Sequence, residues 1–253
     1  MRLDKYLSLA QIGTRKKVKE YIYRGDVRVN GDVICIPAFD VNPSKDKIMY
    51  QEKEMSNIEK VCYMFYKPQG CITAKQDENC RTVFDYLTDI DTTGLFAVGR
   101  LDKNTEGLLL ITNDGELNHL LMNPEHHVEK TYYFWVFGRI DAEEIRRIET
   151  GMDIGDGEIT IPAKIKVLTT GKYSVLREQM RQEGCYAVKR NLHREEVSSG
   201  YLTIFEGKKH QVKRMMKRLG CHVVYLKRVS IGRVVLDETL GKGGYKRIDE
   251  RCF

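Results

Sequence analysis

Two apolar runs that enclose a polar loop constrain the fold of this chain more than any other feature of the sequence. Residues 95–98 (LFAV) and 108–111 (LLLI) each predict a short buried strand, and Asn113-Asp114-Gly115 predicts a turn after the second one. Because strands hold both of its ends, the loop can present Asp102 rigidly, and catalytic residues are common on such loops. The pattern leaves a second interpretation open, in which the Asp102 carboxylate only caps the backbone amides of a turn.

Length and composition indicate two modest, mildly basic domains. The chain has 253 residues, a net charge of +6 and 31% charged residues, which favours a polyanionic partner. No apolar run is long enough to cross a membrane, and the N-terminus lacks the uncharged core of a signal peptide, so we expect a cytoplasmic protein without membrane contact. The seven cysteines are scattered and form no Cys-x-x-Cys pair, which predicts reduced thiols rather than disulfides or a zinc site.

Residues 1–57 predict a small helical domain with a basic face. Apolar residues at helical spacing indicate a helix over 3–10, and Thr14 is a suitable N-cap for a second helix that ends near Gly25. The alternating residues 27–34 then predict a hairpin around Asn30-Gly31. The outer face of the second helix carries Arg15, Lys16, Lys17 and Lys19. Charge alone is equally compatible with a solvated helix face that binds nothing.

Three short motifs in this region resemble the S4 domain, the small RNA-binding module named after the fourth protein of the small ribosomal subunit. They are Arg2-Leu-Asp-Lys5, Thr14-Arg15 and Gly25-Asp-Val-Arg-Val-Asn-Gly31. The resemblance implies that residues 1–57 bind RNA. Because few aromatic residues lie among the cations, we expect this domain to contact phosphates and RNA shape rather than to stack on bases.

Residues 58–253 predict a larger α+β domain. Many short strands and few helices favour a mixed, mostly antiparallel sheet flanked by helices. The strand candidates, besides the two that enclose the Asp102 loop, are 61–66, 130–137, 159–167 and 201–205, and the helix candidates are 116–122 and 141–151. The strand over 130–137 carries aromatic residues on both faces.

A second basic region lies near the C-terminus. Val212, Met215, Met216 and Leu219 follow helical spacing and predict a helix that ends at Gly220. Between Gly207 and Arg233 there are nine Lys or Arg residues and no Asp or Glu, which predicts a second surface for a polyanion. The cations predicted to contact RNA here are Lys209, Arg214 and Lys217.

The run from Gly99 through Asp102 to Gly115, GRLDKNTEGLLLITNDG, resembles the signature of the bacterial pseudouridine synthases of the RsuA type. Lys67-Pro68-Gln-Gly70 and Lys130-Thr131-Tyr132 match two further motifs of that family. The resemblance implies that Asp102 is catalytic, that Tyr132 packs under the target uracil, that Lys213 pairs with Asp102 and that Leu226 packs in the active site. Without the resemblance, these last three would be interpreted as a strand aromatic, a solvated cation and a core residue. Residues 172–198 lie outside it and predict an added arm or helix near the RNA.

The implied reaction cleaves the bond from ribose to uracil N1, turns the base and rejoins it through C5. One ionised carboxylate can attack the anomeric carbon or remove the adjacent ribose proton, and the sequence leaves both routes open for Asp102. Lys213 would hold Asp102 ionised, Leu226 would exclude water, and Arg100 would replace the flipped nucleotide or bind its phosphate. We expect no cofactor and no metal, a monomer, and ribosomal RNA or a pre-ribosomal particle as partner.

Two other functions compete with this hypothesis. A non-catalytic RNA-binding factor for ribosome assembly could retain both basic regions. An RNA methyltransferase with a similar N-terminal domain would need a glycine-rich cofactor loop after a strand, and Gly155-Asp-Gly157 and Gly241-Lys-Gly-Gly244 are too short and badly placed for that role.

Overall fold

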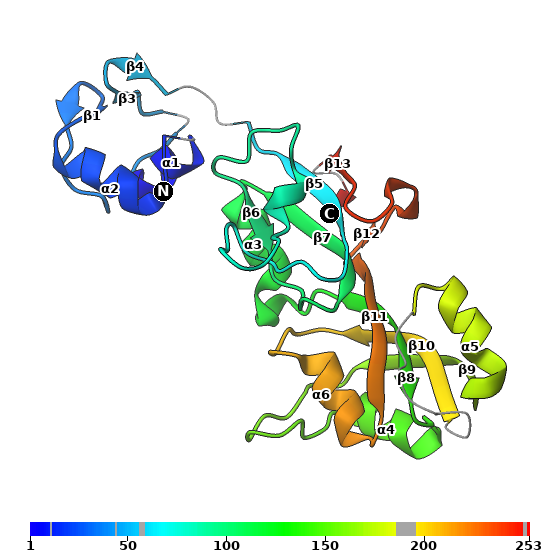
Figure 1. Ribbon diagram of the computed structural model, residues 1–253. Helices are drawn as coiled ribbons and strands as arrows, with labels where there is room; N and C mark the ends of the chain where they lie inside the picture. The colour runs from blue at the N-terminus through cyan, green and yellow to red at the C-terminus, as the bar shows by residue number, and fades with distance from the viewer. Residues whose placement is uncertain (11, 44, 56–58, 186–195, 250–251) are drawn as a thin grey trace.

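The computed structural model describes residues 1–10, 12–43, 45–55, 59–185, 196–249 and 252–253. Figure 1 shows a small N-terminal head, in blue, and a larger α+β unit built on one extended sheet. Within the described ranges, no helix combines the length and apolar composition needed to cross a bilayer. The predicted α+β class is confirmed.

The head consists of two helices and a small antiparallel sheet. Helix α1 (Leu3–Leu9) packs on α2 (Arg15–Tyr23), and the Thr14 hydroxyl caps α2 by accepting from the Lys17 amide at 3.3 Å. The strands are β1 (Val27–Val29), β2 (Asp32–Val33), β3 (Ile48–Tyr50) and β4 (Lys53–Glu54), in the order β2-β1-β3-β4. Asn30 and Gly31 both have positive φ, 53° and 97°, as a tight two-residue hairpin turn requires. Both predicted helices and the hairpin are confirmed.

The larger unit is organised around a nine-stranded sheet. Its strand order is β13-β5-β7-β11-β8-β10-β9, with β6 added beside β7 and β12 beside β11. Among the described strands, only β7 and β11 pair in parallel, so the predicted mixed, mostly antiparallel sheet is confirmed. The strands are β5 (Cys62–Lys67), β6 (Phe96–Val98), β7 (Glu106–Thr112), β8 (Lys130–Phe137), β9 (Lys164–Lys172), β10 (Glu196–Ile204), β11 (His222–Ile231), β12 (Val234–Val235) and β13 (Tyr245–Ile248).

Helices cover both faces of this sheet (Figure 1). Residues of α4 (Ala142–Thr150) and α6 (Gln211–Arg218) share one apolar core with Tyr132 and Phe134 of β8. Residues of α5 (Tyr173–Gln182) pack on the opposite face, against Trp135. Helix α3 (Gly115–Met122) covers β5 and β7, and short 3-10 turns are formed by η1 (Phe84–Tyr86), η2 (Pro124–His126) and η3 (Glu238–Leu240). The prediction of aromatic residues on both faces of β8 is therefore confirmed.

Two strand boundaries differ from the prediction. The strand expected over 159–167 begins only at Lys164, because Pro162 has no N–H for a sheet ladder and Ile159, 69% exposed, forms only an isolated bridge to Asp153. Strand β9 then continues to Lys172, and β10 starts at Glu196, so both ends of the segment 172–198 belong to the sheet. Its predicted helix is α5, and residues 186–195 lie outside the described residues.

Candidate active site

The loop that carries Asp102 joins β6 to β7 and is fastened on both sides of that residue. The Thr73 hydroxyl donates to the Leu101 carbonyl at 2.9 Å and accepts from the Leu101 amide at 3.1 Å. The Gly70 amide donates to the Lys103 carbonyl at 2.8 Å. The backbone at residues 101 and 103 is thus held by partners outside the loop, so the direction of the intervening side chain is fixed.

A buried lysine, Lys67, binds the backbone at the end of the same loop. Lys67 is fully buried, and its Nζ donates to the carbonyls of Thr105 at 2.9 Å and Pro68 at 3.0 Å. Burial lowers the pKa of Lys67, because the charged form loses its hydration. The Lys67-Pro68 motif therefore acts structurally here, by fixing the end of the loop that leads into β7.

The Asp102 carboxylate contacts two side chains from the start of α6. Lys213 Nζ lies 2.7 Å from Oδ2, and His210 Nε2 lies 3.4 Å from Oδ1. The Asp102 side chain remains 27% exposed, so the carboxylate is open to the cleft rather than sealed in the interior. A cation at this distance stabilises the negative charge of the carboxylate. His210 is the N-cap of α6 and has a left-handed backbone with φ of 53°, which places its ring beside the acid.

The pairing of neighbouring strands places the floor of the site next to the Asp102 loop. Gly107 at the start of β7 pairs with Arg228 of β11, and a Cβ at Gly107 would lie 2.2 Å from the Arg228 carbonyl oxygen, so only glycine permits this close parallel pairing. On the next strand, Tyr132 pairs with Arg228, and Phe134 pairs with Leu226. Directly paired residues point to the same face of a sheet, so Tyr132 and Leu226 share the face on which Asp102 lies.

All four residues predicted for catalysis line one cleft of about 810 Å³. Asp102 and Lys213 contribute charged groups at its wall, and Tyr132 and Leu226 contribute buried apolar surface. Arg100 and Lys209, both exposed, line the same cleft. The structure therefore brings together residues that are up to 126 positions apart in the sequence, from Arg100 to Leu226.

The other residues predicted to contact RNA do not line the cleft around Asp102. Arg214 donates to the carbonyls of Gly155 at 2.7 Å and Ile154 at 3.2 Å and pairs with Glu158, so it anchors a neighbouring loop. Lys217 is exposed on α6 but does not line the cleft. On α2 of the head, Lys16 and Lys17 are exposed and Lys19 is half-buried.

Arg15 has a structural contact that the sequence did not predict. Its guanidinium donates to both oxygens of the fully buried Asp4 at 3.1 Å, and Arg2 binds the same carboxylate at 3.0 to 3.1 Å. Burial raises the pKa of Asp4, but the two arginines outweigh this effect and hold it below its ordinary value. Arg15 therefore stabilises the fold of the head, whatever it contributes to RNA binding.

The sequence interpretation missed His210 and Arg228, and it placed Lys67 and Lys130 in family motifs without giving either side chain a role. The nine cations between Gly207 and Arg233 were predicted to form one surface for a polyanion, but they do not all lie on a surface. Arg228 is buried because β11 is a central strand, and Lys227 is half-buried and pairs with Glu238 at 2.8 Å. A count of charges along the chain cannot separate a helix surface from a buried strand.

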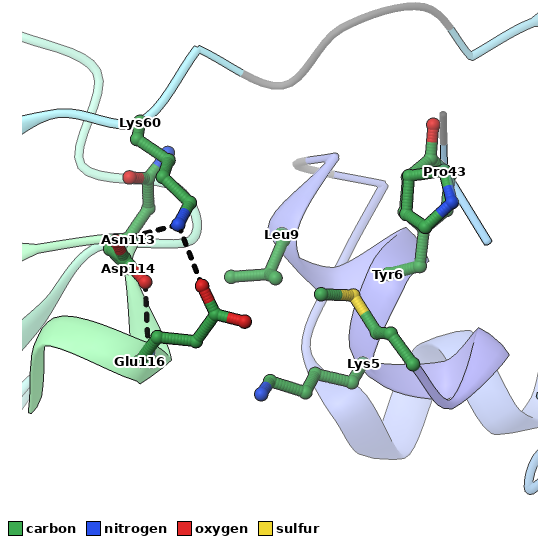
Figure 2. Close-up of a pocket in the computed structure, with 10 residues that line it drawn as sticks. Lys5, Tyr6, Leu9, Pro43, Lys60, Asn113, Asp114 and Glu116 are labelled. Atoms are coloured by element: carbon green, nitrogen blue, oxygen red, sulfur yellow. Dashed lines mark hydrogen bonds and ion pairs between the residues drawn. The ribbon is translucent and has the colours of Figure 1, made fainter. Parts of the chain in front are cut away.

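A smaller hollow lies between α1 and the start of α3 (Figure 2). It has a volume of about 170 Å³ and is lined by Lys5, Tyr6 and Leu9 of the head together with residues near Lys60 and Glu116. Lys60 Nζ lies 2.8 Å from Glu116 Oε2 and 2.9 Å from Asp114 Oδ2. The charge of Lys60 is compensated by these two carboxylates, so this hollow offers no reactive group. The cleft around Asp102 is therefore the candidate active site.

The Asp102 carboxylate, paired with a lysine in a basic cleft whose floor contains an aromatic ring, suits an enzyme that acts on a nucleoside within a polyanion. In the described part of the chain, no three His, Cys, Asp or Glu side chains gather as metal ligands. The comparisons with known proteins define the class as isomerases that act on RNA. The sequence pattern of the RNA pseudouridylate synthase family matches residues 61–218, and that of the S4 domain matches residues 1–47.

Curated relatives match over nearly the whole chain. An uncharacterised RNA pseudouridine synthase of Bacillus subtilis, YtzG, is 39% identical and covers 99% of this chain and 95% of its own. The ribosomal small subunit pseudouridine synthase A of Vibrio cholerae is 34% identical, with 99% and 96% covered. The ribosomal large subunit pseudouridine synthase B of Bacillus subtilis is 36% identical, with 90% and 84% covered.

A solved structure agrees with these matches. The crystal structure of a pseudouridylate synthase that is 30% identical superposes with a TM-score of 0.63 and covers 99% of this chain and 97% of that one. This chain belongs to the RNA pseudouridylate synthase family, and the predicted resemblance to the RsuA type is confirmed. It is an isomerase that converts uridine in RNA into pseudouridine.

Proposed function

We propose that this chain modifies a uridine of ribosomal RNA and that Asp102 is its catalytic carboxylate. The observation that carries the proposal is the Asp102 carboxylate, 2.7 Å from Lys213 Nζ and open to a cleft whose floor contains Tyr132 and Leu226. Relatives named as synthases of the small and of the large ribosomal subunit support ribosomal RNA as the substrate class. Because those names divide between the two subunits, the proposal covers ribosomal RNA of either one.

The reaction breaks the bond between uracil N1 and ribose C1′ and forms a bond between C5 and C1′. Asp102 either attacks C1′, forming an O–C1′ bond that breaks when C5 bonds to C1′, or removes the proton from C2′ and returns it when C5 bonds to C1′. Both routes need an ionised carboxylate beside the sugar. In both routes C5 loses its proton and N1 gains one, so no electron leaves the substrate and no cofactor is needed. Lys213 stabilises the charge of Asp102, Tyr132 supports the detached base, and Leu226 keeps water away from C1′.

The two parts of the chain have different proposed roles. We propose that residues 1–57 bind RNA phosphates, chiefly through Lys16, Lys17 and Lys19, and that residues 58–253 carry the reaction. We place the boundary after residue 57, which lies outside the described residues. Arg100 lines the cleft two positions before Asp102, where it can fill the space left by a flipped nucleotide. A ribosomal RNA or pre-ribosomal substrate implies a cytoplasmic location.

A tritium-release assay at uracil C5 tests the proposal on ribosomal RNA from a strain that lacks the gene. We expect the natural protein to release tritium, Asp102→Asn to release none, and both to bind the RNA with similar affinity, because the substitution keeps the size of the side chain. The matched control is Asp89→Asn, at an exposed position outside the cleft, which should react normally. Turnover by a clean Asp102→Asn preparation would refute the assignment.

The same experiment separates the enzyme from an assembly factor. A natural protein that binds the RNA but releases no tritium, together with an unchanged set of pseudouridines in the deletion strain, would instead support the non-catalytic role.

A further inference from the structure

Two buried cations lie in the floor of the cleft, and the proposed mechanism uses neither. Lys130 is 4% exposed and Arg228 is 2% exposed. The only hydrogen bond of the Lys130 Nζ to a described residue is to the Val128 carbonyl at 3.1 Å, and Arg228 Nε donates to the Leu108 carbonyl at 2.8 Å. Arg228 Nη2 is buried and finds no acceptor among the described residues. A buried donor without an acceptor is rare in proteins and calls for an explanation.

Strand register places both cations beside the predicted support of the uracil. Arg228 pairs directly with Tyr132, and Lys130 lies two residues before Tyr132 on the same strand. All three side chains therefore point to the same face of the sheet. Lys130 and Arg228 both line the cleft that contains Asp102.

No carboxylate compensates these charges. Neither cation forms an ion pair with any residue that the structure describes. The two acids of the cleft are engaged with other cations, Asp102 with Lys213 and His210, and Glu206 with Lys208 at 2.9 Å. Burial and the nearby Arg228 lower the pKa of Lys130 to about 8. Two like charges buried together disfavour the empty site, and an anion placed between them would remove that penalty.

We propose that Lys130 and Arg228 form an anion subsite that receives a backbone phosphate of the RNA strand next to the target nucleotide. The inference rests on the proposed function, because it takes RNA as the ligand of this cleft. Uracil is neutral and cannot compensate two cations, whereas phosphate is the charged group that every nucleotide carries. The Arg228 guanidinium offers a directed N–H donor and Lys130 offers a compact charge, which together suit a phosphodiester.

The first test uses inorganic phosphate and protein without RNA, so it is independent of turnover. The probe is the Cε resonance of Lys130 in protein with 13C-labelled lysine, assigned by its disappearance in Lys130→Met. In chloride we expect this resonance to titrate near pH 8. In phosphate at the same ionic strength the midpoint should move upward, because a bound anion favours the charged lysine. An unchanged midpoint would refute the subsite.

The second test measures affinity for unmodified ribosomal RNA. Lys130→Met should weaken binding about tenfold or more, because one charge-assisted hydrogen bond to the RNA can no longer form. Lys130→Arg should recover most of the affinity, and Lys166→Met, at an exposed position outside the cleft, should bind normally. Equal affinity of Lys130→Met and the natural protein would overturn the inference.

The two proposals can fail separately. Normal tritium release without any phosphate effect at Lys130 would refute only the subsite. A clear phosphate effect without tritium release would refute only the proposed reaction.

Discussion

Replacing Lys130 by methionine should make the RNA-free protein more stable at neutral pH, although a core residue is changed. The pKa of Lys130 falls from its ordinary 10.5 to about 8 in the folded protein. Each pKa unit corresponds to about 1.4 kcal/mol, so the buried charge lowers the free energy of unfolding by roughly 3 kcal/mol. Methionine keeps the length of the side chain but cannot donate the hydrogen bond to Val128, worth about 1 kcal/mol. The expected net gain is therefore about 2 kcal/mol.

The sign of the pH dependence follows from the direction of the pKa. Because the folded protein disfavours the charged lysine, the penalty is fully present below pH 8 and is relieved as the pH rises from about 8 towards 10.5. The stability advantage of Lys130→Met over the natural protein should therefore be large at pH 7 and nearly absent at pH 10. A structural lysine with an ordinary pKa would give no such trend.

Denaturant unfolding followed by tryptophan fluorescence measures this difference. Trp135 is the single tryptophan of the chain, is fully buried on β8, and donates to Glu183 at 2.7 Å, so it reports on the sheet that holds Lys130. Lys166→Met, at an exposed position outside the cleft, serves as the control and should match the natural protein at both pH values. A Lys130→Met protein that is less stable at pH 7, or whose advantage does not depend on pH, would refute the reasoning.

Three further predictions concern the Asp102–Lys213 pair and the head. Lys213→Met should slow single-turnover tritium release by a factor of about 10 to 100, because methionine cannot donate the charge-assisted hydrogen bond to Asp102. An unchanged rate would remove Lys213 from the mechanism. Alanine at Lys16, Lys17 and Lys19 should reduce the slope of log affinity against log salt by about 0.7 to 0.9 for each phosphate that the variant no longer neutralises. An unchanged slope would count against the head as an RNA-binding surface. Asp4→Asn should lower the stability of the head by about 1 to 3 kcal/mol, since the neutral amide cannot compensate the charges of Arg2 and Arg15, and faster hydrogen exchange confined to α1 and α2 would show it.

Features that depend on neighbours in the sequence were predictable. The Thr14 cap and the Asn30-Gly31 turn are set by a few adjacent residues, and the structure has both. The pairing of Lys213 with Asp102 was implied by the family resemblance, and the geometry agrees at 2.7 Å. The roles of these residues in catalysis remain predictions until the variants are measured.

Features that depend on distant strands were not predictable. Arg228 belongs to a run of cations in the sequence, but the central position of β11 buries it. The start of β9 is a different case, because Pro162 is a local signal against a strand that begins at Ile159 and the prediction overlooked it. His210 reaches Asp102 through an unusual left-handed backbone at the start of α6, which no pattern of residue types indicates.

The close pairing of β7 with β11 has a consequence for how this enzyme becomes active. A displacement of β11 by one residue would turn Leu226 and Arg228 to the far side of the sheet while leaving Asp102 and Lys213 in place. A polypeptide that ends before residue 222 would likewise possess the acid, its lysine and Tyr132, but it would lack the part of the floor that Leu226 and Arg228 form. The floor of the cleft is therefore complete only after β11 has been synthesised. This strand contributes no reacting group of its own.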